Sequence, residues 1–199
     1  DKACQPVNVY GSSKFIAERL FTNHDFYSKD TIFASVRYGN VICSRGSFIP
    51  LWMDLIKSGA EIKVTSTEMT RFLFTIEDAV DAVLNSIDVC QGGEVFVPKI
   101  NSYTLPDCIK ALELITGKSS SSRVVGLRPG EKLHEDMLAK TELPFTYEVP
   151  NINLLQIRPQ YTNKTYQDWK KYFGKQLNSK LWVQDDVEKL KKLIVCGLR

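Results

Sequence analysis

The chain has 199 residues, of which 43% are hydrophobic and 25% are charged, and its net charge at pH 7 is +3. This length predicts one folded domain or one and a fraction, and the small, scattered positive charge argues against a nucleic-acid-binding protein. No apolar run reaches the roughly 20 residues of a membrane span and the first residues do not form a signal peptide, so we expect a cytoplasmic protein without membrane contact.

The first element expected is a helix over residues 9–27. Its apolar side chains recur at helical spacing, and we expect them to be buried. The expected stripe consists of Phe15, Ile16, Leu20 and Phe21. A β-favouring run then predicts a strand over residues 31–38 that ends at Gly39.

The next helix is predicted from apolar residues at helical spacing, and Gly59 ends it. The residues of this stripe are Phe48, Leu51, Trp52, Leu55 and Ile56. After it we expect strands at residues 61–64, 71–75, 94–98 and 123–127. Helices are expected at 77–89, at 105–116 with Pro106 in its first turn and Gly117 as its end, and at 187–195. Residues 119–122 are expected to form a polar loop.

Tyr10 and Lys14 lie four residues apart at the start of the first helix, so they can share one face. A lysine ammonium beside a phenol favours the phenolate, which suits Tyr10 to take a proton from a sugar or steroid hydroxyl. This spacing is common by chance, and it gains weight only from the motifs around it.

Several further motifs follow in a fixed order. They are Asp1-Lys2-Ala3, Asn8-Val9-Tyr10-Gly11, Val36-Arg37-Tyr38-Gly39-Asn40-Val41, Ser44-Arg45-Gly46-Ser47, Met69-Thr70-Arg71-Phe72 and Leu127-Arg128-Pro129-Gly130-Glu131-Lys132-Leu133. In order and spacing, the chain resembles the extended short-chain dehydrogenase/reductases that act on nucleotide sugars. Among these it is most similar to the soluble, inverting UDP-N-acetylglucosamine 4,6-dehydratases of polysaccharide biosynthesis, and the resemblance covers nearly the whole chain.

The resemblance implies an α/β fold, namely the C-terminal part of a Rossmann-like doubly wound sheet with a smaller α+β substrate-binding region. Residues 1–45 would end the dinucleotide-binding domain. Residues 46–199 would mainly bind substrate and return some elements to the Rossmann core. The family's glycine-rich G-x-x-G-x-x-G turn, which holds the cofactor pyrophosphate, is not in the sequence. We therefore expect that a cofactor-binding half of roughly 120 residues is absent.

The resemblance also implies the chemistry: oxidation at C4 of the sugar, loss of water across C5 and C6, and return of hydride to C6. Tyr10 would take the 4-hydroxyl proton with the help of Lys14. Lys2 would be the C5 base and Asp1 the acid for the departing 6-hydroxyl, which requires a lowered pKa for the lysine. Since Asp1 begins the chain, a frayed terminus is the alternative for this pair. The implied product is UDP-2-acetamido-2,6-dideoxy-β-L-arabino-hexos-4-ulose.

The implied cofactor is NADP, tightly bound and regenerated in each cycle. Its contacts in this chain would be Tyr10, Lys14, Tyr38, Gly39 and Val41. The UDP-sugar would contact Asn40, Arg45, Arg71, Arg128 and Glu131. Arginine can hold a diphosphate bidentately, although Arg71 and Arg128 could each be an ordinary surface arginine. Glu131 could equally cap a helix or pair with a lysine.

No metal site is expected, because the chain has only two histidines and its five cysteines form no Cys-x-x-Cys pair. Family members commonly oligomerise, so a homo-oligomer is expected. Two alternatives stay open: a fragment of a nucleotide-sugar epimerase, and a non-catalytic remnant that binds UDP-sugar. The Asp1-Lys2 pair disfavours the epimerase, because epimerisation at C4 needs no elimination acid.

Overall fold

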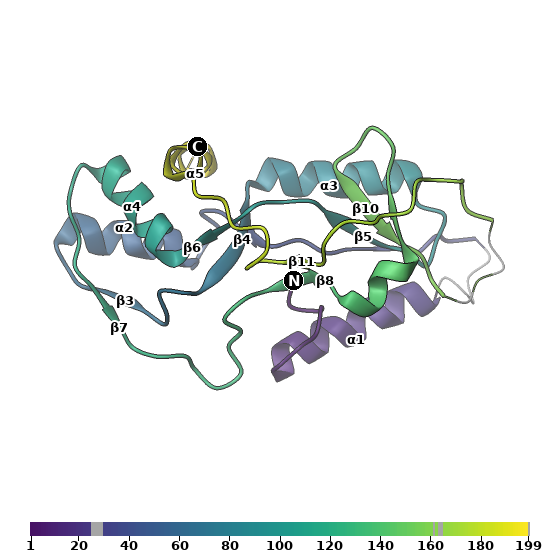
Figure 1. The fold of residues 1–199 in the computed structure, drawn as a ribbon, viewed down its shortest axis with the longest axis horizontal. Coiled ribbons are helices and arrows are strands. Elements are labelled where there is room, and N and C mark those ends of the chain that lie inside the picture. Colours follow the sequence, from purple (N-terminus) through teal and green to yellow (C-terminus); the bar gives the residue numbers. More distant parts are fainter. Residues whose placement is uncertain (25–29, 161, 163–164, 199) are drawn as a thin grey trace.

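The computed structural model describes residues 1–24, 30–160, 162 and 165–198. Figure 1 shows an elongated molecule with two parts along its longest axis. One part is built around a mixed sheet with a helix on each side. The other contains helices α2 (Phe48–Ser58), α4 (Leu105–Thr116) and α5 (Val187–Gly197).

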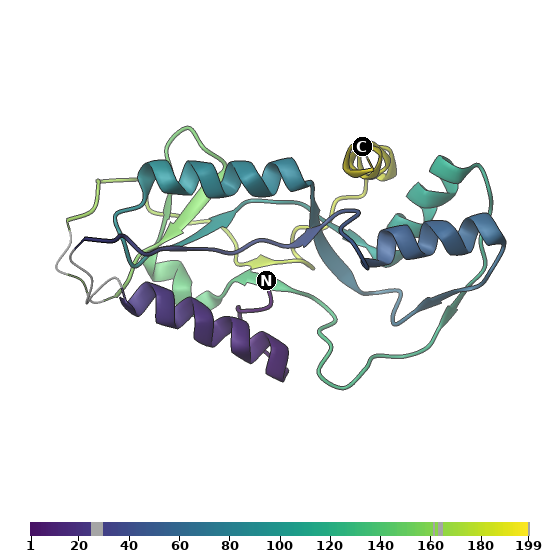
Figure 2. The ribbon, with the colours of Figure 1, turned by 180° about the vertical axis from the view of Figure 1, so that it is seen from behind.

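The mixed sheet has the strand order β1-β5-β10-β9. Strand β1 (Ser35–Val36) is parallel to β5 (Val95–Pro98), while β10 (Leu154–Ile157) is antiparallel to both β5 and β9 (Thr146–Glu148). Helix α3 (Ile76–Val89) lies on one side of this sheet and α1 (Val9–His24) on the other, as both views show (Figures 1 and 2). Parallel pairing between helices on both faces confirms the expected α/β fold class.

A second sheet joins the two parts of the molecule. In it, β2 (Asn40–Val41) is parallel to β4 (Thr70–Phe74), and β4 is antiparallel to β6 (Ser102–Thr104). Two small pairs complete the fold. These are β3 (Ile62–Val64) with β7 (Ser122–Val124), parallel, and β8 (Asp136–Leu138) with β11 (Leu177–Asn178), antiparallel. A 3-10 helix, η1 (Lys140–Phe145), follows β8.

The helix ends follow the local chemistry of the sequence. Thr75 accepts a hydrogen bond from the backbone of Asp78, whose side chain accepts one from the Thr75 backbone, and this capping box starts α3. Gly59 and Gly117 end α2 and α4 with positive φ angles of 73° and 68°, a conformation that glycine adopts at little cost. Both glycine stops were expected from the sequence.

Apolar side chains form a core in each part of the molecule. The core under α2, α4 and α5 includes Ile49, Trp52, Ile56, Leu112, Leu190 and Ile194. The core of the mixed sheet includes Phe72, Val97, Met137, Leu138, Leu155 and Leu177, with a smaller group of Ala82, Phe96, Val149 and Leu154 beside it.

The buried face predicted for the first helix is wrong. Phe15, Ile16, Leu20 and Phe21 are 40%, 57%, 65% and 54% exposed, whereas Gly11, Glu18 and Thr22 are buried. The reason is electrostatic, because Glu18 turns toward the buried guanidinium of Arg37 and brings the polar face of α1 onto the sheet. The expected end of this helix, at residue 27, lies outside the described residues. In α2, Leu51 of the expected stripe is also exposed.

The predicted strands differ from the observed strands more than the predicted helices differ from the observed helices. The strand expected over residues 31–38 pairs only at Ser35–Val36, and the one expected over 123–127 is Ser122–Val124. The small strands from β8 onward were not predicted, because they contain only two to four residues each and periodicity cannot define so short an element. The division into regions at residue 45 stays a prediction.

Candidate functional site

Two adjoining cavities gather most of the predicted site residues. The larger, about 590 Å³, lies between α1 and the segment that contains β1, and the smaller, about 310 Å³, lies beside the turn at residues 128–131. Lys2 and Asn40 line both. The larger is also lined by Asp1, Tyr10, Lys14, Arg37, Tyr38 and Gly39. The smaller is also lined by Asn8, Arg71, Arg128, Glu131, Lys132 and Glu135.

Helix α1 presents Tyr10 and Lys14 to the larger cavity. The Lys14 Nζ atom lies 5.4 Å from the centre of the Tyr10 ring, so the two side chains share one face as the spacing predicts. Tyr10 is 62% exposed. Among the described residues, neither the Tyr10 hydroxyl nor Lys14 Nζ has a hydrogen-bond partner, so both remain available to a ligand.

The start of α1 is fixed by Asn8 and Gly11. The Asn8 side chain accepts a hydrogen bond from Gly11 N at 2.8 Å, as an N-cap does, and donates one to Gly130 O at 2.7 Å. A Cβ atom on Gly11 would lie 2.8 Å from Lys2 O and 3.0 Å from Pro6 Cβ. Only glycine therefore lets the helix that carries Tyr10 approach the segment that carries Lys2.

Asp1 and Lys2 are held in place. The Asp1 amino group donates to Tyr38 O at 2.9 Å, and Lys2 Nζ donates to Asp1 Oδ1 at 2.7 Å and to Glu135 Oε1 at 3.2 Å. Burial lowers the pKa of Lys2, and the Glu135 carboxylate opposes that shift. Burial, together with the charges of Lys2 and Arg37, lowers the pKa of the Asp1 amino group to about 5. These contacts are at odds with a frayed terminus.

The segment after β1 passes close over β4. A Cβ atom on Gly39 would lie 2.5 Å from Phe72 Cβ and 2.8 Å from Phe72 O, so packing alone requires glycine at this position. The next residue, Asn40, reaches the junction of the two cavities. Its Oδ1 atom is buried and has no hydrogen-bond partner among the described residues, as is also true of Asp1 Oδ2 and Glu135 Oε2. These three oxygens can accept hydrogen bonds from ligand hydroxyls.

Arg71 and Arg128 both line the smaller cavity but differ in environment. Arg71 is buried, and its Nη atoms donate to the backbone oxygens of Thr70, Lys132 and Leu133 at 2.8–3.2 Å. It therefore positions the following segment and has few donors left for a ligand. Arg128 is exposed, and its guanidinium remains available. Glu131 accepts a hydrogen bond from Arg128 N at 3.2 Å, which shapes the turn.

Two residues named from the sequence lie outside both cavities. Arg45 is exposed in the turn after β2, and Val41 is half-buried within β2. Conversely, Asn8 and Glu135 line the smaller cavity and were not identified as site residues. An Asn directly before the first residue of a helix is a recognisable N-cap pattern, whereas nothing in the sequence marks Glu135 as a neighbour of Lys2.

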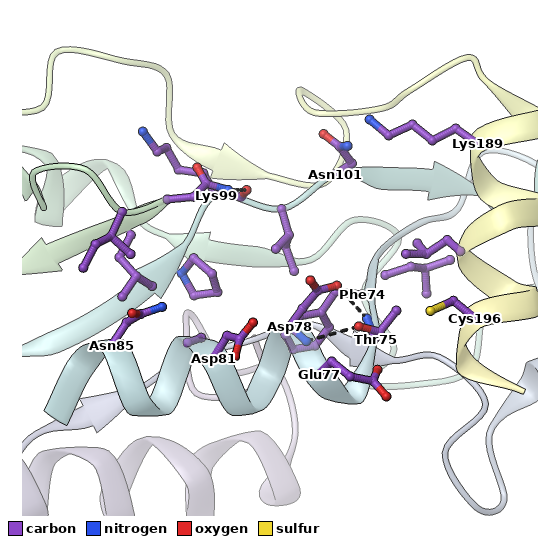
Figure 3. A pocket seen from close by; sticks show the side chains of 18 of the residues that line it. Phe74, Thr75, Glu77, Asp78, Asp81, Asn85, Lys99, Asn101, Lys189 and Cys196 are labelled. Atoms are coloured by element: carbon purple, nitrogen blue, oxygen red, sulfur yellow. Dashed lines mark hydrogen bonds between the residues drawn. The ribbon is translucent and has the colours of Figure 1, made fainter. Parts of the chain in front are cut away.

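A third cavity, of about 700 Å³, lies away from the two adjoining cavities, between α3, residues 98–101 and α5. Figure 3 shows acidic side chains of α3 along one wall and Lys99 and Lys189 along another. Asp78 in that wall is already bonded to Thr75 in the capping box. This cavity contains none of the predicted catalytic or binding residues.

Within the described part of the chain, no three His, Cys, Asp or Glu residues gather in a way that could hold a metal ion. None of the helices in the described ranges has the length and apolar character needed to cross a membrane. The two cavities bring together an acid, an amine and a tyrosine beside the turn that carries Arg128. Such a set can move protons on a ligand that has hydroxyl and anionic groups.

Comparison with known proteins identifies relatives. A family model described as "Polysaccharide biosynthesis protein" matches residues 1–156. A Campylobacter jejuni protein named UDP-N-acetylglucosamine 4,6-dehydratase (inverting) is 41% identical over 167 residues, which are 82% of this chain and 49% of that protein. A Rickettsia akari protein named UDP-glucose 4-epimerase is 39% identical over 145 residues, covering 72% of this chain and 42% of that protein.

Among solved structures, the X-ray structure of Pen from Bacillus thuringiensis is similar over 99% of this chain and 60% of that chain. Its TM-score is 0.85 and its sequence identity 31%. The present chain thus spans about half the length of the curated relatives that it matches.

Proposed function

The chain belongs to the polysaccharide biosynthesis protein family, and on this premise we propose that it forms the catalytic and substrate-binding part of a C5-inverting UDP-N-acetylglucosamine 4,6-dehydratase. The observation that carries the proposal is the Asp1–Lys2 pair at the junction of the two cavities. Elimination of water needs both a base and an acid beside the sugar, and the Lys2 amine and the Asp1 carboxyl group can supply them. A simple oxidation or epimerisation needs no such pair.

The larger cavity fits the nicotinamide end of a dinucleotide. The Lys14 ammonium and the Tyr10 hydroxyl offer hydrogen bonds to a ribose diol, and Tyr38 and Gly39 complete the wall. When bound, the cofactor supplies hydride acceptance from C4 and hydride return to C6 of the sugar. We propose NADP as this cofactor. NADP specifically, a cytoplasmic location and homo-oligomer formation remain predictions.

The chain's own groups move the protons. Tyr10 takes the proton of the 4-hydroxyl as C4 becomes a ketone, and the ketone makes the C5 hydrogen acidic. The neutral Lys2 amine then takes the C5 proton. The electrons of the C5–H bond form a C5–C6 double bond, the C6–O bond breaks, and Asp1 protonates the departing oxygen so that water leaves. Once hydride has been returned to C6, C5 would regain a proton that exchanges with solvent, which completes the 4-keto-6-deoxy sugar. Burial lowers the pKa of Lys2, which favours the neutral amine that this step needs.

The smaller cavity would hold the UDP diphosphate. Arg128 provides an exposed guanidinium there, and Arg71 fixes the segment that follows. Charge-assisted hydrogen bonds from arginine to phosphate can be bidentate and are about twice as strong as neutral ones. The unpartnered oxygens of Asn40 and Asp1 would accept hydrogen bonds from the sugar.

The test is to incubate the protein, purified from its source, with UDP-N-acetylglucosamine in D2O and to follow the sugar by NMR. We expect a 4-keto-6-deoxy product with deuterium at C5. A second candidate, a 4-epimerase, is favoured by the Rickettsia relative's name, and it predicts instead a C4 epimer that retains the 6-hydroxyl and gains no deuterium. Binding of UDP without any product would support the non-catalytic alternative.

A further inference from the structure

Glu135 approaches the Lys2 amino group from a distant part of the chain. Its Oε1 atom accepts a hydrogen bond from Lys2 Nζ at 3.2 Å, across a sequence separation of 133 residues. Lys2 Nζ also donates to Asp1 Oδ1 at 2.7 Å, so the amino group lies between two carboxylates. Asp1 is the sequence neighbour of Lys2 and moves with it, whereas Glu135 fixes the amino group relative to the smaller cavity.

Ser179 holds both the backbone N–H and the backbone C=O of Glu135 by hydrogen bonds. Glu135 N donates to Ser179 Oγ at 2.7 Å, and Ser179 N donates to Glu135 O at 2.7 Å. Ser179 Oγ in turn lies 2.6 Å from Thr70 Oγ1 in β4. Glu135 is only 4% exposed. Its carboxylate is therefore presented from a fixed and buried position.

Three cations surround this carboxylate. Besides Lys2, Arg71 Nε lies 3.8 Å from Oε1, and Lys132 Nζ lies 4.0 Å from Oε2. Lys132 Nζ also donates to Cys4 O at 2.6 Å. The Oε2 atom is buried and has no hydrogen-bond partner among the described residues. A buried carboxylate with unused accepting capacity is suited to bind a charge that appears during a reaction.

We infer that Glu135 is a positioning residue for Lys2, holding its amino group at the junction of the two cavities and stabilising the ammonium that forms when Lys2 accepts a proton. The inference deepens the proposed function and rests on it, because Lys2 is the C5 base only in a dehydratase. The proton comes from C5, and Glu135 itself neither gains nor loses one.

The charged or titratable groups that face Lys2 are Asp1, Glu135, Arg71 and Tyr10. Burial lowers the pKa of Lys2, and the Glu135 carboxylate limits this effect. Glu135→Gln removes the charge but keeps the size and one accepting oxygen, so the pKa of Lys2 should fall further. A merely structural role of Glu135 would not change the titration of Lys2 in a variant that stays folded.

The experiment is pH-dependent labelling of the protein with acetic anhydride, in which mass spectrometry of the peptide that contains Lys2 follows modification of the Lys2 amine. In E135Q we expect the midpoint of the Lys2 profile to move to lower pH, with labelling near neutral pH increased about three- to tenfold. Glu135→Asp, which restores the charge, should return the midpoint toward that of the unmodified protein. Asp136→Asn is the matched control, since Asp136 is buried beside Glu135 and bonds to Gln176 and Asn178.

Thermal unfolding identifies variants that are not folded. For an unfolded E135Q, Ser179→Ala takes its place, because it removes the hydroxyl that accepts from Glu135 N and should move the Lys2 midpoint by releasing the carboxylate, whereas an unchanged midpoint in folded S179A overturns the role of Glu135. An unchanged midpoint in folded E135Q, or an equal shift in D136N, overturns the role of Glu135. Labelling does not depend on turnover. Product formation with an unshifted profile would thus overturn Glu135 alone, and a shifted profile without product would overturn the dehydratase.

Discussion

The guanidinium of Arg37 is bound at two points by the carboxylate of Glu18, through Nε–Oε2 at 2.6 Å and Nη2–Oε1 at 2.7 Å. Glu142 of η1 binds the same guanidinium at 2.7 and 2.8 Å. Arg37 follows β1 directly, and Glu18 lies in the middle of α1. The pair therefore joins the helix that carries Tyr10 and Lys14 to the sheet.

Arg37→Met should destabilise the protein strongly. It would leave Glu18, which is only 6% exposed, with the partly exposed Arg19 as its remaining cation, and breaking a buried pair costs about 3–5 kcal/mol. Urea unfolding at pH 7 measures the loss. Arg123→Met is the control, because Arg123 pairs with Glu61 at 3.0 Å on the surface, where such pairs contribute about 0–1 kcal/mol. Equal losses in the two variants would contradict the importance of the buried pair.

The same pair predicts a loss of stability in acid. Burial by itself raises the pKa of Glu18, but the hydrogen bonds and charge of Arg37 outweigh it and hold this pKa below its usual value. The stabilisation is thus present above the unfolded-state pKa of about 4.3 and is lost as pH falls through the lower folded-state pKa. Urea unfolding between pH 3 and 7 should show this decline, and Glu18→Gln should flatten it. A parallel decline in E18Q would assign the acid sensitivity to other groups.

Gly11→Ala should separate Tyr10 from Lys2. The added Cβ would meet Lys2 O at 2.8 Å, so either α1 or the segment of residues 2–6 must move, at about 1–3 kcal/mol. We expect lower thermal stability and faster labelling of the Lys2 amine. Ser13→Ala, at an exposed position of the same helix, should change neither property. A stabilised G11A variant, as expected from the higher helix propensity of alanine, would show that the close approach is not tight.

The two arginines of the smaller cavity should respond differently to removal. Arg128→Ala should weaken UDP binding about tenfold, the effect of one charge-assisted hydrogen bond, without changing stability, because Arg128 is exposed. Arg71→Ala should lower stability as well, since three backbone oxygens lose their donors. Calorimetric titration with UDP and thermal unfolding measure the two effects. Unchanged UDP affinity in R128A would remove the turn from the proposed binding site.

Some elements of the fold could be predicted from the sequence and others could not. Helices α2 and α4 were predictable because apolar periodicity and a glycine stop agree at Gly59 and Gly117. The buried face of α1 was not, because the position of that helix is determined by Arg37, whose partners Glu18 and Glu142 lie 19 and 105 residues away in the sequence. Local patterns carry no information about a long-range ion pair of this kind.

The site shows the same limit. Motif order was enough to predict residues that line the two cavities, among them Lys2, Tyr10, Asn40 and Arg128. The contact of Lys2 with Glu135 depends on how Ser179 and Thr70 hold that segment, and none of these residues is close to Lys2 in the sequence. Arg71 was expected to face a ligand, yet most of its donors hold the chain itself.

The Asn8 side chain is hydrogen-bonded both to helix α1 and to the turn at residues 128–131. Its oxygen caps the first turn of α1, and its nitrogen donates to Gly130 in the turn beside the smaller cavity. Because one rigid amide group makes both bonds, the turn cannot shift away from the helix without breaking one of them. The two cavities therefore keep a fixed position relative to each other. A diphosphate bound against the turn would then lie at a fixed distance from the helix that carries Tyr10.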